Sequence, residues 1–216
     1  MKTYIKLILS AGLLSLLLFQ TSCSKEDYLT DTGLHQAQTP LDAYDYLAAH
    51  PYHYFDTLLT IIDHYNLKEE VNSAGTFFAP TDRSVNLFIR QKQTALRLED
   101  EDAVYTLESL FEDLPADSVK QYLFNEKMTL DQLSTTETTY NTLGTTAVKI
   151  QKVLQTDAAY YTWSTTPVYF LYYIKDVGAA TPTRVQCQTT GILTKNGTGT
   201  ILHVLANTHV FSSFTN

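Results

Sequence analysis

The chain has 216 residues, enough for one domain with a core of its own, and its 44% hydrophobic and 18% charged residues exclude a chain that is disordered throughout. A net charge of −8 argues against nucleic acid as a partner, because phosphates are bound by basic surfaces. Two cysteines cannot build a disulfide scaffold. The sums describe an acidic globular protein, rich in aromatic residues.

Residues 1–22 have the layout of a bacterial lipoprotein signal peptide. Lys2 and Lys6 precede an uncharged apolar stretch, Leu7 to Phe19, which is too short to be typical of a spanning helix. Small residues then stand directly before Cys23, as in the lipobox, and this resemblance implies that Cys23 is acylated and anchors the protein to a membrane. The alternative is an ordinary signal peptide with an incidental cysteine.

Residues 23–40 are predicted to form a lipidated, flexible tether. The run Ser24–Asp27 resembles the export signal that sends some Gram-negative lipoproteins to the outer cell surface. We therefore expect an outer-membrane lipoprotein, exposed on the cell. Removal of residues 1–22 takes away two lysines and no acid, so the mature chain carries a net charge of −10 and Cys187 is its only free thiol.

Residues 41–216 are expected to form a single domain in which helices come first and strands last. Helical spacing of apolar residues predicts helices at Leu41–Ala49, Phe55–Tyr65, Val85–Ile89 and Leu107–Phe111, and a fifth that is capped by Asp117 and carries Val119, Tyr122 and Leu123 inward. β-Branched and aromatic residues predict strands at Ala147–Val153, Ala159–Trp163, Val168–Ile174, Arg184–Leu193 and Thr200–Leu205. This order indicates an α+β fold with the helices packed on one side or end of a sheet.

Two segments carry motifs. In the first, Phe77 and Phe78 predict a short buried strand, Pro80 ends it, and Thr81 or Asp82 is placed to cap the following helix. In the second, Asn196-Gly197 forms a turn signal that leads into a final apolar strand with His203 at its centre.

These segments resemble the first and closing signatures of the fasciclin domain, and Tyr140–Gly144 fits the family's turn into a strand. The resemblance covers Thr39 to Phe214 and implies a fasciclin-like compact β-sandwich or wedge, with N-terminal and intervening helices packed on one side. It also implies adhesive binding. The residues that match the family motifs are Thr76, Phe77, Phe78, Ala79, Pro80, Thr81, Asn196, Gly197, His203 and Val204.

The chain departs from the family pattern in three places. Tyr122-Leu123 stands where the family usually has Tyr-His. Thr198-Gly199 has the character of an insertion, which predicts a bulge or a wider hairpin. The stretch from Gly144 to Asn196 is longer than the family norm, and it includes an aromatic run that begins at Tyr160.

No catalytic motif, cofactor motif or metal-ligand spacing is complete, so we expect a protein that is not an enzyme and holds no metal or cofactor. His50 and His53 form an H-x-x-H pair without a third ligand, and Glu99–Asp102 lacks the glycine of a calcium loop. His203 is expected to be a buried histidine bonded to backbone near Thr81 or Asp82. Cys187 is expected to fill the core.

Aromatic residues are dense between residues 160 and 174. Tyr160, Tyr161 and Trp163 are the possible ligand-binding residues, because flat rings with polar tips can stack on sugars or anchor a protein partner. Core packing is the preferred interpretation of the strand Val168–Ile174.

The function that these features indicate is a surface-exposed, lipid-anchored fasciclin-domain protein that mediates adhesion to protein or polysaccharide partners on cells or in a matrix. The alternative is an accessory glycan- or nutrient-binding lipoprotein of an outer-membrane uptake system. In both, the membrane is contacted through the lipid anchor only, and nucleic acid is not a partner.

Overall fold

The computed structural model describes residues 37–144, 146–156 and 167–212. The chain divides into two compact units, Met1–His35 and Gln36–Asn216, and the described residues all lie in the second. The expected strand Ala159–Trp163 lies outside the described residues, as do Cys23, Tyr160, Tyr161 and Trp163.

The described helices gather in the first half of this unit. They are α2 (Ala43–Ala48), α3 (Asp56–His64), α4 (Lys68–Ser73), α5 (Asp82–Leu96), α6 (Leu107–Asp113) and α7 (Asp117–Lys120). The predictions that correspond to α2, α3, α5 and α6 are confirmed. The fifth was wrong in its cap and its length: Ala116 precedes α7, which ends at Lys120. Leu123 is in a strand instead, because its backbone pairs with Phe77.

The strands form one seven-stranded sheet in the order β2-β1-β7-β6-β5-β4-β3. Their bounds are β1 (Thr76–Ala79), β2 (Leu123–Phe124), β3 (Thr138–Asn141), β4 (Ala147–Leu154), β5 (Tyr169–Lys175), β6 (Thr183–Leu193) and β7 (Ile201–Leu205). Only β1 and β7 pair in parallel among the neighbours in this sheet. The predictions that correspond to β1 and β4 to β7 are confirmed.

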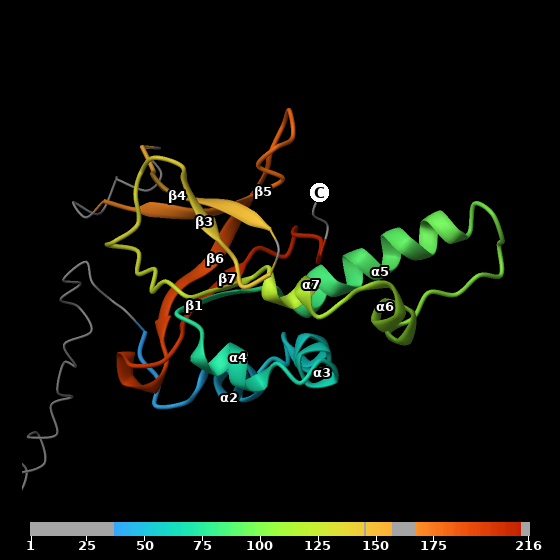
Figure 1. The fold of residues 1–216 in the computed structure, drawn as a ribbon, viewed down its shortest axis with the longest axis horizontal. Coiled ribbons are helices and arrows are strands. Elements are labelled where there is room, and N and C mark those ends of the chain that lie inside the picture. Colours follow the sequence, from blue (N-terminus) through green and yellow to red (C-terminus); the bar gives the residue numbers. More distant parts are fainter. Residues whose placement is uncertain (1–36, 145, 157–166, 213–216) are drawn as a thin grey trace, which may run out of the picture. The chain divides into compact units, whose positions relative to one another are not determined.

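The sheet curls until its two edges nearly meet. Just past β3, the backbone N–H of Leu143 donates to the carbonyl of Leu123 in β2, at 2.8 Å. The described strands thus form one sheet, nearly closed into a barrel, which is compatible with the compact β-rich fold that was expected. The α+β arrangement is confirmed, and Figure 1 shows α2, α3 and α4 together on one side of the sheet.

The two motif segments lie side by side in this sheet, as its second and third strands. Phe77 pairs with Leu202 and Phe78 with His203, although more than half of the chain separates them. Both strands are buried along their whole length. Gly75 leads into β1 where no side chain fits, since a Cβ there would lie 2.1 Å from the carbonyl oxygen of Asn125.

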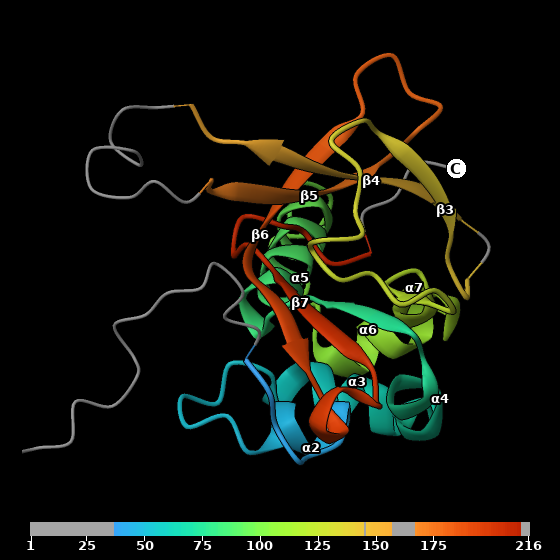
Figure 2. The same ribbon diagram turned by 90° about the vertical axis from the view of Figure 1, so that its left-hand side faces the viewer.

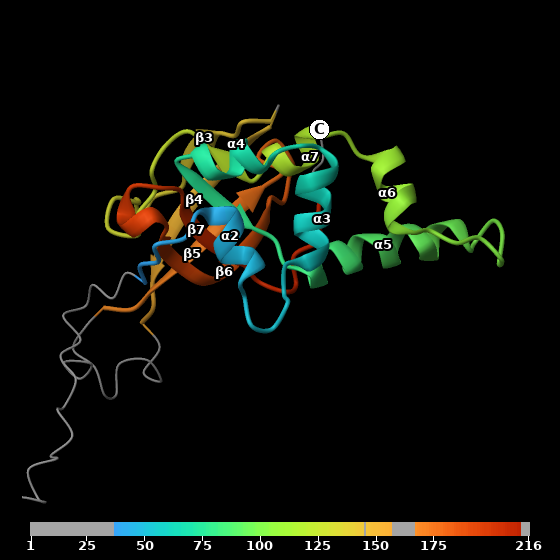
Figure 3. The ribbon, with the colours of Figure 1, turned by 90° about the horizontal axis from the view of Figure 1, so that it is seen from below.

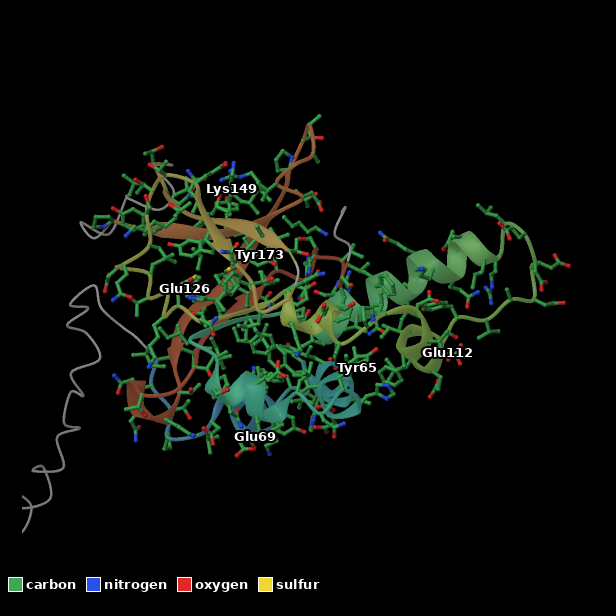
Figure 4. All side chains as sticks on the ribbon, in the orientation of Figure 1. Tyr65, Glu69, Glu112, Glu126, Lys149 and Tyr173 are labelled. Carbon is green, nitrogen blue, oxygen red and sulfur yellow. The ribbon has the colours of Figure 1, made fainter. Side chains whose placement is uncertain are left out.

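The core between sheet and helices is aromatic. The Phe78 ring lies 5.5 Å from Phe124 and 5.4 Å from Tyr173, centroid to centroid. Tyr173, labelled in Figure 4, donates its hydroxyl to the carbonyl of Gln121 at 2.8 Å. The prediction that β5 packs in the core holds for Leu171, Tyr173 and the residues after them, whereas Phe170 and Tyr172 are only half-buried.

Candidate functional site

A cleft of about 360 Å³ lies between the loop after α2 and the strands β6 and β7. Figure 2 shows this loop beside the lower ends of the two strands. The cleft is lined by Tyr46, His50, Tyr54, Phe55, Gln188, Thr189, Ile192, Val204 and Asn207. Its volume is within the usual range for small-ligand sites, roughly 300–1,000 Å³.

One wall is an aromatic cluster in the loop between α2 and α3. Phe55 is buried and anchors the loop, whereas Tyr52 and Tyr54 are 70% and 51% exposed. The rings of these two tyrosines stack at 5.6 Å and 25°, and the His50 ring lies 5.1 Å from that of Tyr54. A positive φ of 51° at His53 turns the chain between the tyrosines. The loop therefore offers flat ring faces to solvent at the mouth of the cleft.

The opposite wall is the irregular part of β6. The register of β6 on β7 shifts between Cys187 and Thr189 and again between Thr189 and Ile192, as in β-bulges. Gly191 takes a φ of +73°, and its N–H donates to Nδ1 of His203 at 3.1 Å. Bulges re-aim side chains, and these place Gln188 and Thr189 against the cleft.

The polar groups of the cleft are available to a ligand. The Thr81 hydroxyl donates to Oδ1 of Asn207 at 2.8 Å, which fixes that amide at the edge of the cleft. Within the part of the chain that the structure describes, the amide nitrogen of Asn207 and the side chains of Gln188 and Thr189 make no hydrogen bond. These groups can donate hydrogen bonds to a bound molecule or accept them from it, and no hydrogen bond within the protein has to break first.

The described residues of the lining include no Asp, Glu, Lys or Arg. A charged ligand would lose water of hydration on entering this cleft and would find no carboxylate, lysine or arginine of the opposite charge there. The lining thus differs from the chain as a whole, which has a net charge of −8. A neutral molecule with an apolar face and several hydroxyls matches both walls.

His203 is buried behind the cleft, and its role is structural. It accepts from Gly191 at Nδ1, so Nε2 carries the proton and donates to the carbonyl of Met128 at 2.8 Å. Burial lowers the pKa of His203 to about 4, which keeps the ring neutral. The expected backbone bonding is confirmed, but the expected partners near Thr81 or Asp82 were wrong, because the bulge of β6 brings Gly191 to the ring.

The other family-motif residues are divided between core and turn. Thr76, Phe77, Phe78, Ala79 and Pro80 are buried in and after β1, and Val204 lines the cleft. Asn196 and Gly197 lie in a short 3₁₀ turn, Lys195–Gly197, and both have positive φ. Thr198-Gly199 belongs to this wider connection, and the bulges lie in β6 instead.

Thr81 is the residue before α5, but its hydroxyl bonds Asn207 rather than its own helix. Asp82 accepts from the N–H of Leu58 at 3.0 Å and so caps the first turn of α3.

Of the H-x-x-H pair, His53 contacts Asp56, with 3.2 Å between the imidazole nitrogen and the carboxylate oxygen. The described residues include no group of three or more His, Cys, Asp or Glu side chains that could hold a metal ion. Glu99–Asp102 lies in the exposed loop after α5. Cys187 is a buried free thiol, and burial raises its pKa.

Sequence reasoning missed a second buried histidine. His209 is 2% exposed, and its Nε2 lies 2.7 Å from the hydroxyl of Tyr122, which accepts from the N–H of Ser212 at 2.9 Å. Burial lowers the pKa of His209 to about 3. The tyrosine of the expected Tyr-His position thus has a histidine partner, but one that arrives from the C-terminal segment. No local sequence pattern predicts this contact between Tyr122 and His209.

Nothing in the described part of the chain is a helix long and apolar enough to span a membrane. No protein-family model and no curated protein matched the sequence.

Proposed function

We propose that this chain is a lipid-anchored, fasciclin-like binding protein of the outer cell surface, and that it holds neutral polysaccharide in the cleft between the α2–α3 loop and β6. The observation that carries the ligand class is the stacked, exposed pair of Tyr52 and Tyr54 beside an uncharged lining. A pyranose ring has apolar C–H faces and a rim of hydroxyls, so it can stack on the rings and bond the amides.

The family part of the proposal is supported by the direct pairing of the two motif segments as neighbouring strands. It is also supported by the cleft itself, because Thr81 and Val204, one from each motif, hold or line it. The anchor at Cys23 and the surface location follow from the N-terminal sequence pattern alone. A lipid anchor on the cell surface and a cleft that binds polysaccharide would together allow adhesion of the cell to a polysaccharide coat or matrix.

A second candidate is capture of oligosaccharides beside an outer-membrane transporter. The size of the cleft favours it, because about 360 Å³ suits the end of a saccharide rather than a long stretch of polymer. Neighbouring genes for a transporter and glycosidases would support capture, and tighter binding of long polymers than of short oligosaccharides would support adhesion.

The test is a glycan array with the chain from Ser24 onward, followed by titration of any hit. Tyr54→Ala is expected to weaken binding at least about tenfold, the usual loss for a stacking aromatic residue. Tyr172→Ala is the matched control, because Tyr172 is a half-buried tyrosine of β5 that does not line the cleft. It should bind as the unchanged chain does. A blank array contradicts the proposal. Loss with Trp163→Ala but not with Tyr54→Ala would move the site to residues 160–163.

A further inference from the structure

The segment Asp82–Asp113, which we call the arm, comprises α5, the loop after it and α6. Figures 1 and 3 show the second half of α5 and the loop standing away from the rest of the unit. At 1.5 Å per residue, α5 is about 22 Å long. The arm carries an unusual distribution of charge and apolar surface.

Two arginines near the base of the arm have no partner of their own. The guanidinium groups of Arg83 and Arg90 make no hydrogen bond or ion pair within the described residues, where the side chain of every other lysine and arginine makes at least one polar or electrostatic contact. The two lie two helical turns apart and line one hollow of about 180 Å³ with Asn86 and Leu87. Isolated guanidinium groups that share a hollow are typical of a surface that binds carboxylates.

The tip of the arm has the opposite character. Glu99–Asp102 supplies four consecutive exposed carboxylates, and no lysine or arginine of the described residues pairs with them. Beside them, Leu98 is 85% and Val104 65% exposed. A partner surface that covered these two apolar side chains would remove them from water, which favours association.

The outer face of α5 continues from the arginines toward the tip. Leu87, Arg90 and Thr94 lie on one stripe of the helix and line a further hollow of about 280 Å³. Two arms laid antiparallel about a twofold axis would bring the acidic tip of each to the arginines of the other. The same arrangement would lay Leu98 over the stripe that contains Leu87. Both contacts would occur twice, as in any twofold interface.

We propose that the arm is a self-association surface, and that a second copy of this chain occupies it through Glu99–Asp102 on Arg83 and Arg90. An acidic polysaccharide would also neutralise the arginines. An acidic polysaccharide would not contact Leu87, Leu98 or the acidic tip, whereas a second copy of the chain would contact all three. This proposal does not depend on the ligand of the cleft.

The test is sedimentation of the full chain in detergent micelles at low and high salt. A dimer is expected at low salt, and it should weaken as salt screens the exposed charges. Arg83→Glu with Arg90→Glu is expected to raise the dimer dissociation constant by at least about tenfold. Adding Glu99→Arg and Glu101→Arg to the same chain should restore the dimer, which a merely misfolded variant would not do.

A chain with Glu69→Arg and Glu126→Arg serves as a control, because it changes two exposed acids outside the arm and should dimerise as the unchanged chain does. A monomer at all protein and salt concentrations overturns the proposal. So does failure of the charge swap to restore dimers, or a monomer that binds dextran sulfate through the two arginines.

Discussion

Two histidines show how single residues link the fold to pH. His203 and His209 are both buried and neutral, and burial lowers the pKa of one to about 4 and of the other to about 3. In the unfolded chain an ordinary histidine binds its proton near pH 6.5. Between these values the unfolded state binds more protons than the folded state, so stability is complete above pH 6.5 and falls as the pH decreases toward 4.

We expect the free energy of unfolding at pH 5 to be lower than at pH 7.5 by up to about 2 kcal/mol for each histidine. Urea unfolding at the two pH values measures this loss. Asp113 and Glu137 add little to this loss, because hydrogen bonds from Lys92 and Lys149 lower the pKa of the two carboxyls. His203→Gln should reduce the pH dependence. Equal stability at both pH values would contradict this account.

At the scale of elements, the bulged part of β6 couples the fold to the cleft. Gly191 takes a φ of +73°, at which a side chain is strained, yet no heavy atom of the described residues lies within 4 Å of where its Cβ would stand. Gly191→Ala therefore tests the backbone alone, without a clash. We expect a loss of about 1 kcal/mol in the free energy of unfolding.

The matched control is Gly178→Ala, since that site is equally open and has no positive φ. It should be nearly neutral in urea unfolding. Gly191→Asn should fall between the two, because asparagine tolerates the left-handed region better than alanine. If Gly191→Ala and Gly178→Ala have the same effect, the bulge does not depend on the glycine.

The elements that the sequence predicted are those with a strong periodic signal. The apolar stripe of α3 and the β-branched run of β4 are examples. The ones missed have weak patterns: α4 buries only Val71 among its six residues, β2 has two residues, and β3 alternates half-buried and exposed. These elements depend on their neighbours rather than on their own sequence.

The candidate site could not be predicted, because its walls come from residues 46–55 and 188–207, which only the folded sheet brings together. The available signal was the run His50-Pro51-Tyr52-His53-Tyr54, whose aromatic residues lack the spacing of a buried helix face. The sequence does show these as surface residues. It does not show that the bulges of β6 place the unbonded side chains of Gln188 and Thr189 opposite them.

At the scale of the whole molecule, the N-terminal end of the compact unit can be located by its hydrogen bonds. Sequence composition predicts a tether through residue 40, yet Gln38 forms a parallel β-bridge with Leu193. The N–H of Leu193 donates to Ala37, and the carbonyl of Leu193 accepts from Thr39. Asn196 also donates its N–H to the Thr39 carbonyl at 2.9 Å. Residues 37–39 therefore close the end of β6 and the turn that follows it.

Two shortened chains separate tether from fold. A chain that begins at Gln36 keeps these bonds and should match the full chain, with a free energy of unfolding within about 0.5 kcal/mol. A chain that begins at Leu41 leaves buried Leu193 without its backbone partners and should lose about 1–3 kcal/mol. The measurement is urea unfolding of both chains. Thr39→Ala in the longer chain removes the bond that the Thr39 hydroxyl accepts from the N–H of Leu41, so it divides the loss between backbone and side chain. Equal stability of the two chains would mean that residues 37–39 belong to the tether and that the sheet is complete without them.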